Sequence, residues 1–540
     1  MRSTMGIGSL TIGQILRHGA TWHSGREVVS ALEGATQRST FADIGAEASR
    51  LANGLRSIGI DGDARVGTLL WNNRTHLVAY LAVPAMGAVI HSANLRLFPD
   101  QLAYTINEAQ DEVIIVDPDL VDQLVDILPR LTSVRTVVVN GPSVPESLSG
   151  AAGIAVLTYE ALTSAENDVF EWPEVDENAA AALCFTTGTT GDPKGVAYSH
   201  RSIVLQCMSS ATTNALRIGA DDRALIVVPM FHATAWGYPY AAYWFGADLV
   251  LPSRHLDASS LLRLIQDERV NFANGVPTIW NSVLQELESN PSWDISSLER
   301  VIVGGAALPA TLFDSFDKLG ISFIQGWGMT ETSPLVSVAR PLANASPEDQ
   351  RSQSLSQGRV VAGVELRLRD SESGHPVPAD GTSVGEIELR GPWVTSSYLG
   401  GHGEDKFHDG WLRTGDIGTV DSHGYVRLTD RSKDIIKSGG EWISSVDLEN
   451  CLIGHPNLLD AAVIGVPDPR WDERPCAVIV PKPGSSIEIE EIRSWLVGRV
   501  AKWWIPERWS VVDLIPKTSV GKIDKKELRQ RYSEGALPIN

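Results

Sequence analysis

The chain has 540 residues, of which 43% are hydrophobic and 21% are charged. This composition is typical of globular proteins and excludes a disordered scaffold, and a length of about 150 residues per domain predicts three to four compact units. Lys and Arg total 45 against 66 Asp and Glu, which gives a net charge of −21 and argues against nucleic acid or an anionic membrane surface as a partner.

The N-terminal residues and the cysteines indicate a protein of a reducing compartment. Residues 1–19 lack the continuous apolar segment of a signal peptide. The most apolar run, 81–90, contains Pro84 and Gly87 and is shorter than the ~18 residues that cross a bilayer. The four cysteines are scattered, in neither a disulfide framework nor a metal-binding pattern. We therefore expect a cytoplasmic protein without an integral membrane segment.

Short β-rich runs alternate with amphipathic patterns over the first 330 residues. In chain order these patterns predict a helix at 41–58, a strand at 64–70, a helix at 99–109, a strand at 113–116, a helix at 120–128, a strand at 136–139, a helix at 201–211, strands at 224–228 and 247–251, helices at 259–269 and 278–288, and strands at 301–303 and 322–325. Such alternation predicts mainly parallel sheets covered by helices.

The pattern changes near Val361. Segments beginning at Val364, Gly385 and Tyr425 alternate apolar and polar residues between Gly, Pro and Asp turns, which predicts an antiparallel or small β-barrel-like sheet. Charged and glycine-rich residues follow, and then a shorter α/β pattern. The fold class expected is α/β, with a boundary at 430–434 between a large N-terminal domain and a C-terminal domain of about 110 residues.

The most informative segment is 185–196, which contains four threonines, three glycines and Lys194. Its backbone can expose several N–H groups beside hydroxyl donors and a cation, which suits a polyphosphate better than a plain turn. The segment is not a Walker A loop, because Pro193 precedes the lysine and Gly195 follows it, and it lacks the G-x-G start of a dinucleotide fingerprint.

This loop resembles the signature loop of the adenylate-forming superfamily, which comprises acyl-CoA synthetases, peptide-synthetase adenylation domains and luciferases. Five further segments match the superfamily in its order: 304–309, 325–332, 411–416, 430–442 and 516–522. The resemblance implies an ATP- and Mg²⁺-dependent enzyme. Such an enzyme joins a carboxylic acid to AMP, releases pyrophosphate, and transfers the acyl group to coenzyme A. It also implies a mobile C-terminal domain, 436–540, joined by a hinge at 431–435 to an N-terminal AMP-binding domain, 1–430.

The resemblance assigns the nucleotide site. The residues implied to bind phosphates are Thr186, Thr187, Gly188, Thr189, Thr190 and Lys194, with Thr187 and Glu331 at the metal. Trp327 would pack on adenine and Thr330 would contact the α-phosphate. The residues lining the nucleotide beside them are Gly304, Gly305, Ala306, Gln325, Gly326, Gly328 and Met329, and Asp416 and Arg431 would bind the ribose hydroxyls.

The resemblance also assigns the catalytic lysine and the groups of the second step. Lys522 would bridge the attacking carboxylate and the α-phosphate, whereas Lys525 and Lys526 are expected to be ordinary solvated lysines. Rotation about Lys433, where many relatives carry Asp, would bring other groups to the site. These are Lys437 at the adenylate phosphate and Gly439, Gly440, Glu441 and Trp442 along the pantetheine arm.

The acyl side is expected around residues 229–237. Amino-acid-activating relatives carry Asp where His232 stands, so an amino-acid substrate is not expected. Phe231 and Trp236 offer an apolar wall, and His232 and Trp236 are candidates for a gate between the acyl pocket and the CoA tunnel, although an aromatic strand end is also typical of plain core.

The substrate expected is a medium- or long-chain fatty acid. The alternatives are a short thioether acid (3-methylmercaptopropionate), an aryl-alkanoic acid, or a stand-alone adenylation enzyme that loads a carrier protein. Family resemblance alone implies a homodimer.

Overall fold

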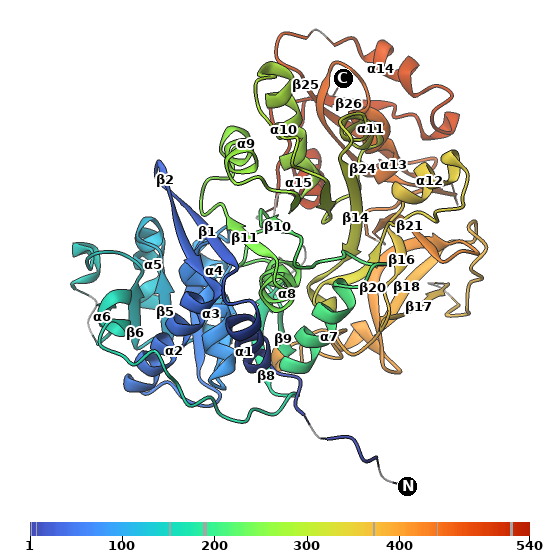
Figure 1. Cartoon of the computed structure of the whole chain (residues 1–540). Coiled ribbons are helices and arrows are strands. Elements are labelled where there is room, and N and C mark those ends of the chain that lie inside the picture. The colour runs from blue at the N-terminus through green and yellow to red at the C-terminus, as the bar shows by residue number, and fades with distance from the viewer. Residues whose placement is uncertain are drawn as a thin grey trace.

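The computed structural model describes residues 1–540 except 2, 7, 151–152, 187–191, 371–372, 432, 440, 486, 519–521 and 540, and the side chain of Glu441. Over these residues, three sheets organise the chain, and helices fill the space between and around them (Figure 1). None of the described helices combines the length and the apolar character needed to cross a membrane.

The first sheet has seven strands and is parallel except for its last pair. Its order is β7 (Ala155–Thr158), β6 (Thr136–Val139), β5 (Val113–Val116), β3 (Arg65–Leu69), β4 (Val89–Ser92), β8 (Ala180–Phe185) and β9 (Gly195–Ser199). The helices of this region are α1 (Ile12–Trp22), α2 (Phe41–Ser57), α3 (Arg74–Ala85), α4 (Pro99–Ala109), α5 (Val121–Ile127), α6 (Tyr159–Thr163) and α7 (His200–Ser210). The antiparallel β8–β9 hairpin carries the predicted phosphate loop at its turn.

The second sheet has fourteen strands and changes character at β14. Its order is β2 (Ala35–Thr40), β1 (Glu27–Leu32), β11 (Asp248–Leu251), β10 (Arg223–Leu225), β12 (Phe272–Gly275), β13 (Arg300–Val303), β14 (Ser322–Gly328), β15 (Leu335–Val338), β16 (Gly358–Val360), β21 (Tyr425–Arg431), β20 (Trp411–Val420), β18 (Gly385–Arg390) and β17 (Glu365–Arg369), with β19 (Phe407–His408) beside β20. Strands from β1 to β14 in this order pair in parallel, and those from β14 to β17 pair antiparallel. The predicted antiparallel part is therefore confirmed, and it continues the parallel sheet through β14.

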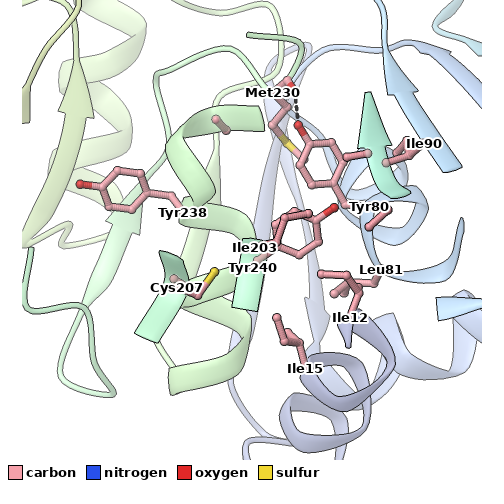
Figure 2. Packing of buried hydrophobic residues seen from close by; sticks show 14 of the residues in the cluster. Ile12, Ile15, Tyr80, Leu81, Ile90, Ile203, Cys207, Met230, Tyr238 and Tyr240 are labelled. Atoms are coloured by element: carbon pink, nitrogen blue, oxygen red, sulfur yellow. Dashed lines mark hydrogen bonds between the residues drawn. The ribbon is translucent and has the colours of Figure 1, made fainter. Parts of the chain in front are cut away.

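Five of the described helices accompany this second sheet: α8 (Tyr238–Phe245), α9 (Ala258–Asp267), α10 (Pro277–Ser289), α11 (Ala310–Lys318) and α12 (Pro347–Ser354). The main core lies where α1, α3, α7 and α8 meet between the two large sheets. Figure 2 shows Ile12 and Ile15 of α1, Tyr80 of α3 and Tyr240 of α8 converging there, and the rings of Tyr80 and Tyr240 are 5.2 Å apart.

A smaller C-terminal domain follows β21. Its five-stranded sheet has the order β23 (Glu441–Ile443), β22 (Ile436–Ser438), β25 (Asp472–Pro481) and β24 (Leu458–Asp468), with β26 (Arg508–Val511) paired to β25. Its helices are α13 (Ser445–Ile453), α14 (Ile489–Leu496) and α15 (Lys525–Ser533). Figure 1 shows this domain at one end of the molecule near α10 and α11, and Gly454 lies against Thr311 of α11. The expected α/β class with a small C-terminal domain is confirmed.

Candidate functional site

The candidate site lies where β13 and β14 end and the β8–β9 hairpin turns. Thr186 and Lys194 close that hairpin, because the Thr186 amide donates to the Lys194 carbonyl at 2.9 Å and the Lys194 amide donates to Thr186 Oγ1 at 3.1 Å. The Lys194 ammonium lies 5.1 Å from the ring centroid of Tyr398. Four predicted phosphate-binding residues lie outside the described residues: Thr187, Gly188, Thr189 and Thr190.

Glycines keep the nucleotide side open. A Cβ on Gly304 would meet the carbonyl of Gly326 at 2.9 Å and the Trp236 ring at 3.0 Å, so only glycine allows β13 to end this close to β14. Gly305, with a φ of +79°, and Ala306 are exposed beside it. On β14, Gly328 is more restricted still, because a Cβ there would lie 1.4 Å from the Pro334 carbonyl oxygen.

The other predicted residues of β14 make the frame of the site. Gln325 is buried and its side-chain oxygen accepts from the amide of Leu308 at 3.2 Å. The amide of Met329 donates to Thr332 Oγ1 at 3.0 Å, which opens the short turn Thr330–Thr332. Thr330 is buried, and its carbonyl accepts from the hydroxyl of Tyr198 at 2.6 Å.

Asp416 links the predicted adenine and ribose groups. Trp327 Nε1 donates to Asp416 Oδ2 at 3.1 Å, and Arg431 Nε lies 3.3 Å from Asp416 Oδ1. Asp416 and Arg431 are direct partners across β20 and β21, so the sheet register brings the acid and the base together. The structure thus gathers Trp327, Asp416 and Arg431 in one place.

Glu331 is a buried carboxylate beside this group. Tyr398 donates its hydroxyl hydrogen to Glu331 Oε1 at 2.5 Å. Among the described residues no group of three His, Cys, Asp or Glu side chains could enclose a metal ion. A single carboxylate nevertheless fits Mg²⁺, because that ion takes one or two carboxylates and completes its shell with phosphate oxygens and water.

Lys522 reaches the site from the C-terminal domain. Its Cε lies 3.8 Å from the position of a Cβ on Gly305. Burial lowers the pKa of Lys522 to about 8; Arg431 acts in the same direction, while Asp416 and Glu331 oppose the shift. An ammonium of lowered pKa near the residues predicted for the nucleotide can stabilise negative charge that develops during a reaction.

The acyl-side residues lie on a left-handed turn. Ala233, Thr234, Ala235, Trp236 and Gly237 all have positive φ, from 38° to 77°. This turn directs the Trp236 ring onto Gly304, at the junction with the nucleotide side.

His232 and Phe231 precede the left-handed turn. Burial first, then Lys522 and Arg96, lower the pKa of His232 to about 3, so the imidazole is neutral at pH 7. Phe231 is only 2% exposed, and the Arg96 guanidinium lies 5.9 Å from its ring centroid. Phe231 therefore belongs to the hydrophobic core and also flanks the left-handed turn.

The groups predicted for the second step stand apart from this cluster. Lys437 is exposed and its amide donates to Glu473 at 2.9 Å, and Gly439, with a φ of +63°, packs against Trp471. Trp442 is half-buried on β23 of the same small sheet. Gly440 and the side chain of Glu441 lie outside the described residues, and Lys433 is exposed between β21 and β22.

One expectation for the lysines is wrong. Lys525 is not a solvated lysine: its side chain is 10% exposed and its ammonium lies 2.9 Å from Glu449, while Lys526 is exposed as expected. Lys525 begins α15, and its placement there turns it toward α13 instead of solvent. Sequence reasoning also missed Tyr398, Tyr198 and Arg96, because none of them lies in a matched segment.

The family follows from sequence comparison. Residues 16–399 match the family described as AMP-binding enzyme, and residues 447–522 match the AMP-binding enzyme C-terminal domain. The chain belongs to the AMP-binding enzyme family. The resemblance to adenylate-forming enzymes is therefore confirmed.

Individual relatives cover the whole length. The chain is 42% identical over 530 residues to a 3-methylmercaptopropionyl-CoA ligase of Ruegeria lacuscaerulensis, with 97% of this chain and 98% of that protein covered. It is 43% identical over 538 residues to a long-chain-fatty-acid–CoA ligase of Thermus thermophilus, with 98% and 97% covered. The crystal structure of the anthranilate CoA ligase AuaEII with anthranoyl-AMP superposes with a TM-score of 0.88 at 27% identity, covering 99% of this chain and 100% of that one.

Proposed function

We propose that this protein is an AMP-forming carboxylic acid:CoA ligase. It converts a carboxylic acid and ATP to acyl-AMP and pyrophosphate, and then transfers the acyl group to coenzyme A with release of AMP. The observation that carries the proposal is the position of Lys522 of the C-terminal domain, which lies against Gly305 at the end of β13 and interacts electrostatically with Asp416, Arg431 and Glu331. A cation there can neutralise the charge that passes from the attacking carboxylate to the α-phosphate.

The chain's other groups have matching roles. Thr186, Lys194 and the loop between them hold the β- and γ-phosphates, Trp327 and the glycines of 304–305 hold the adenine, and Asp416 with Arg431 holds the ribose. Thr330 contacts the α-phosphate. Glu331, with Thr187, holds Mg²⁺, which when bound neutralises phosphate charge.

The proposed substrate is a medium- or long-chain fatty acid. The apolar wall at Trp236 and the neutral state of His232 suit an uncharged acyl chain. A 3-methylmercaptopropionate-type thioether acid and an aryl acid remain the alternative substrates, because relatives of this chain are described with acids of both kinds.

The second step requires a different arrangement of domains. In the arrangement that places Lys522 near Gly305, Lys437, Gly439 and Trp442 lie on or beside β22 and β23 of the C-terminal sheet. We infer that the C-terminal domain, 436–540, rotates about a hinge at 431–435, centred on Lys433, to present these groups to CoA. The protein is further proposed to be cytoplasmic and to form a homodimer. Size-exclusion chromatography with light scattering tests the oligomeric state.

The test of the function is pyrophosphate release with ATP and Mg²⁺ over a panel of acids, with and without CoA. The panel runs from propionate to palmitate and includes methylthio- and aryl-alkanoates. A maximum at medium or long chains with formation of acyl-CoA supports the fatty-acid proposal. A maximum at a thioether or aryl acid replaces the substrate only, whereas acyl-AMP formation that ignores CoA overturns the ligase assignment.

A further inference from the structure

Tyr398 lies between the two oppositely charged groups of the phosphate site. Its side chain is 4% exposed, its hydroxyl donates to Glu331 Oε1 at 2.5 Å, and its ring centroid is 5.1 Å from the Lys194 ammonium. Phe407 supports the ring edge-on, with centroids 5.5 Å apart. One buried side chain thus contacts both the carboxylate proposed for Mg²⁺ and the lysine proposed for phosphate.

The segment that carries Tyr398 also holds the backbone of the carboxylate. The Thr395 amide donates to the Glu331 carbonyl at 2.8 Å, so the same loop after β18 fixes the main chain and the side chain of Glu331. Gly403 further along has a φ of +69°, and a Cβ there would meet the Lys194 ammonium at 2.6 Å. Glycine at this position leaves room for the lysine over the ring.

The ring also keeps the two charges from neutralising each other. In the part of the chain that the structure describes, Lys194 makes no ion pair with an acidic side chain, although Glu331 is bound to the other end of the same tyrosine. A direct Lys194–Glu331 pair would consume the charges that ATP and its metal need. A ring face attracts the ammonium without accepting its hydrogen bonds, and a phenol hydroxyl fixes the carboxylate without cancelling its charge.

We propose that Tyr398 is a positioning residue that sets the geometry of the Mg²⁺ carboxylate and the phosphate lysine together; this rests on the proposed function. The hydroxyl acts on Glu331 and the ring acts on Lys194. The two contacts can therefore be separated by substitution. Loss of the hydroxyl affects the metal-dependent part of ATP binding, and loss of the ring affects both parts.

The experiment is isothermal titration of ATP into the purified full-length protein, with Mg²⁺ and again with EDTA, for the wild type, Tyr398→Phe and Tyr398→Leu. For Tyr398→Phe we expect an about tenfold weaker Kd with Mg²⁺, the scale of one charge-assisted hydrogen bond, and an unchanged Kd in EDTA. For Tyr398→Leu we expect weaker binding under both conditions.

The matched control is Tyr243→Phe. Tyr243 is fully buried on α8 and its hydroxyl donates to the carbonyl of Phe41 at 2.7 Å, so the variant loses a buried tyrosine hydrogen bond to a neutral acceptor in the core. Thermal unfolding of the variants shows whether each one is folded. Equal losses with and without Mg²⁺ for Tyr398→Phe, or no loss at all, would overturn the proposal. If the wild type itself binds no ATP, the proposed function fails and this inference fails with it.

Discussion

At the scale of single residues, the feature that matters most is the environment of Lys522. Lys522 of the small domain lies against the exposed Gly305, and its charge interacts with Arg431, Asp416 and Glu331. We expect Lys522→Ala to slow acyl-AMP formation by several orders of magnitude, the scale of ~3–5 kcal/mol for a lost transition-state contact. Thioester formation from supplied acyl-AMP should change much less. Rapid-quench assays of the two half-reactions measure both, and equal losses would reject the assigned role.

The pH dependence follows from the same lysine. Because the pKa of Lys522 is lowered to about 8, its cationic form is complete well below pH 8 and is lost as the pH rises through that value. For acyl-AMP formation, kcat/KM is therefore expected to fall above about pH 8, since this parameter reports the free enzyme. His232 has a pKa of about 3, so its titration should not change kcat/KM near neutral pH. In the control Lys522→Arg, whose guanidinium stays charged, the residual activity should not show the fall; a wild-type profile flat to pH 9.5 would contradict the assignment.

Most of the residues proposed for the nucleotide site can be named from the sequence, because segments such as 325–332 and 411–416 match the family in residue type and order. What the sequence does not contain is the pairing between segments. Asp416 and Arg431 become neighbours only through the β20–β21 register. Tyr398 gains its proposed role only because the loop after β18 packs on Glu331. Such residues carry no local signal, since a tyrosine among serines is equally typical of a surface turn.

At the scale of elements, the left-handed turn at 233–237 has an energetic cost. Left-handed backbone costs about 1–2 kcal/mol for each non-glycine residue, so the surrounding structure must hold the turn in place. Gln206 of α7 does part of this, because its Nε2 donates to the Trp236 carbonyl at 3.3 Å and its side chain lies against Gly237.

We therefore expect Gly237→Ala to destabilise the protein and to disturb the acyl side. The new Cβ would lie 2.2 Å from Gln206 Oε1 and would place alanine at a φ of +77°. The melting temperature should drop by several degrees, and acyl-chain selectivity should change because Trp236 must move. The double variant Gln206→Ala/Gly237→Ala should recover part of the loss, as expected for residues in contact. Differential scanning calorimetry measures this, and strict additivity would show that the clash is not the cause.

Sequence patterns do not reveal a helix that is buried on all sides. The six helices and seven strands predicted over the first 330 residues all occur, three of them (99–109, 113–116 and 136–139) with the predicted ends and the others with ends shifted, but α3 has no detectable pattern because residues 75–85 are all buried. A helix covered on every side has no polar stripe and thus no 3.6-residue period to detect. Pro84 falls in its last turn, and Gly87, with a φ of +94°, then turns the chain into β4. Pro84 and Gly87 suggest an interrupted apolar segment in the sequence, but in the structure they mark the last turn of α3 and the residue after its C-cap.

At the scale of the whole molecule, a buried polar cluster crosses the domain boundary. Asp430, at the end of β21, accepts from the amide of Ser445 at 2.8 Å and also from its hydroxyl, at the start of α13. Lys525 donates to the same hydroxyl and lies 2.9 Å from Glu449. On the other side of Lys433, Arg529 pairs with Asp434 at 2.7 Å. If the small domain turns about the proposed hinge, the contact of Asp430 with Ser445 has to break.

Ser445→Ala should therefore shift the balance between the two arrangements. The variant removes the hydroxyl from Asp430 and Lys525 but keeps the amide, which corresponds to about 0.5–1.5 kcal/mol. We expect acyl-AMP formation to slow about two- to tenfold while thioester formation from supplied acyl-AMP is unchanged or faster. The matched control is Ser510→Ala, since Ser510 is fully buried in β26 and has no hydrogen-bond partner among the described residues. Equal slowing of both half-reactions would mean that the cluster does not distinguish the two arrangements.

The position of Lys522 has a consequence for the order of events in the proposed catalytic cycle. In the arrangement of domains described above, Lys522 lies against Gly305 and near the groups proposed for the first reaction. Under the proposed mechanism, coenzyme A can reach the acyl group only after the small domain has moved Lys522 away. Pyrophosphate can therefore leave before the thiol enters, as in a ping-pong sequence. The proposed rotation of the small domain then belongs to the second half of the cycle, after the mixed anhydride has formed.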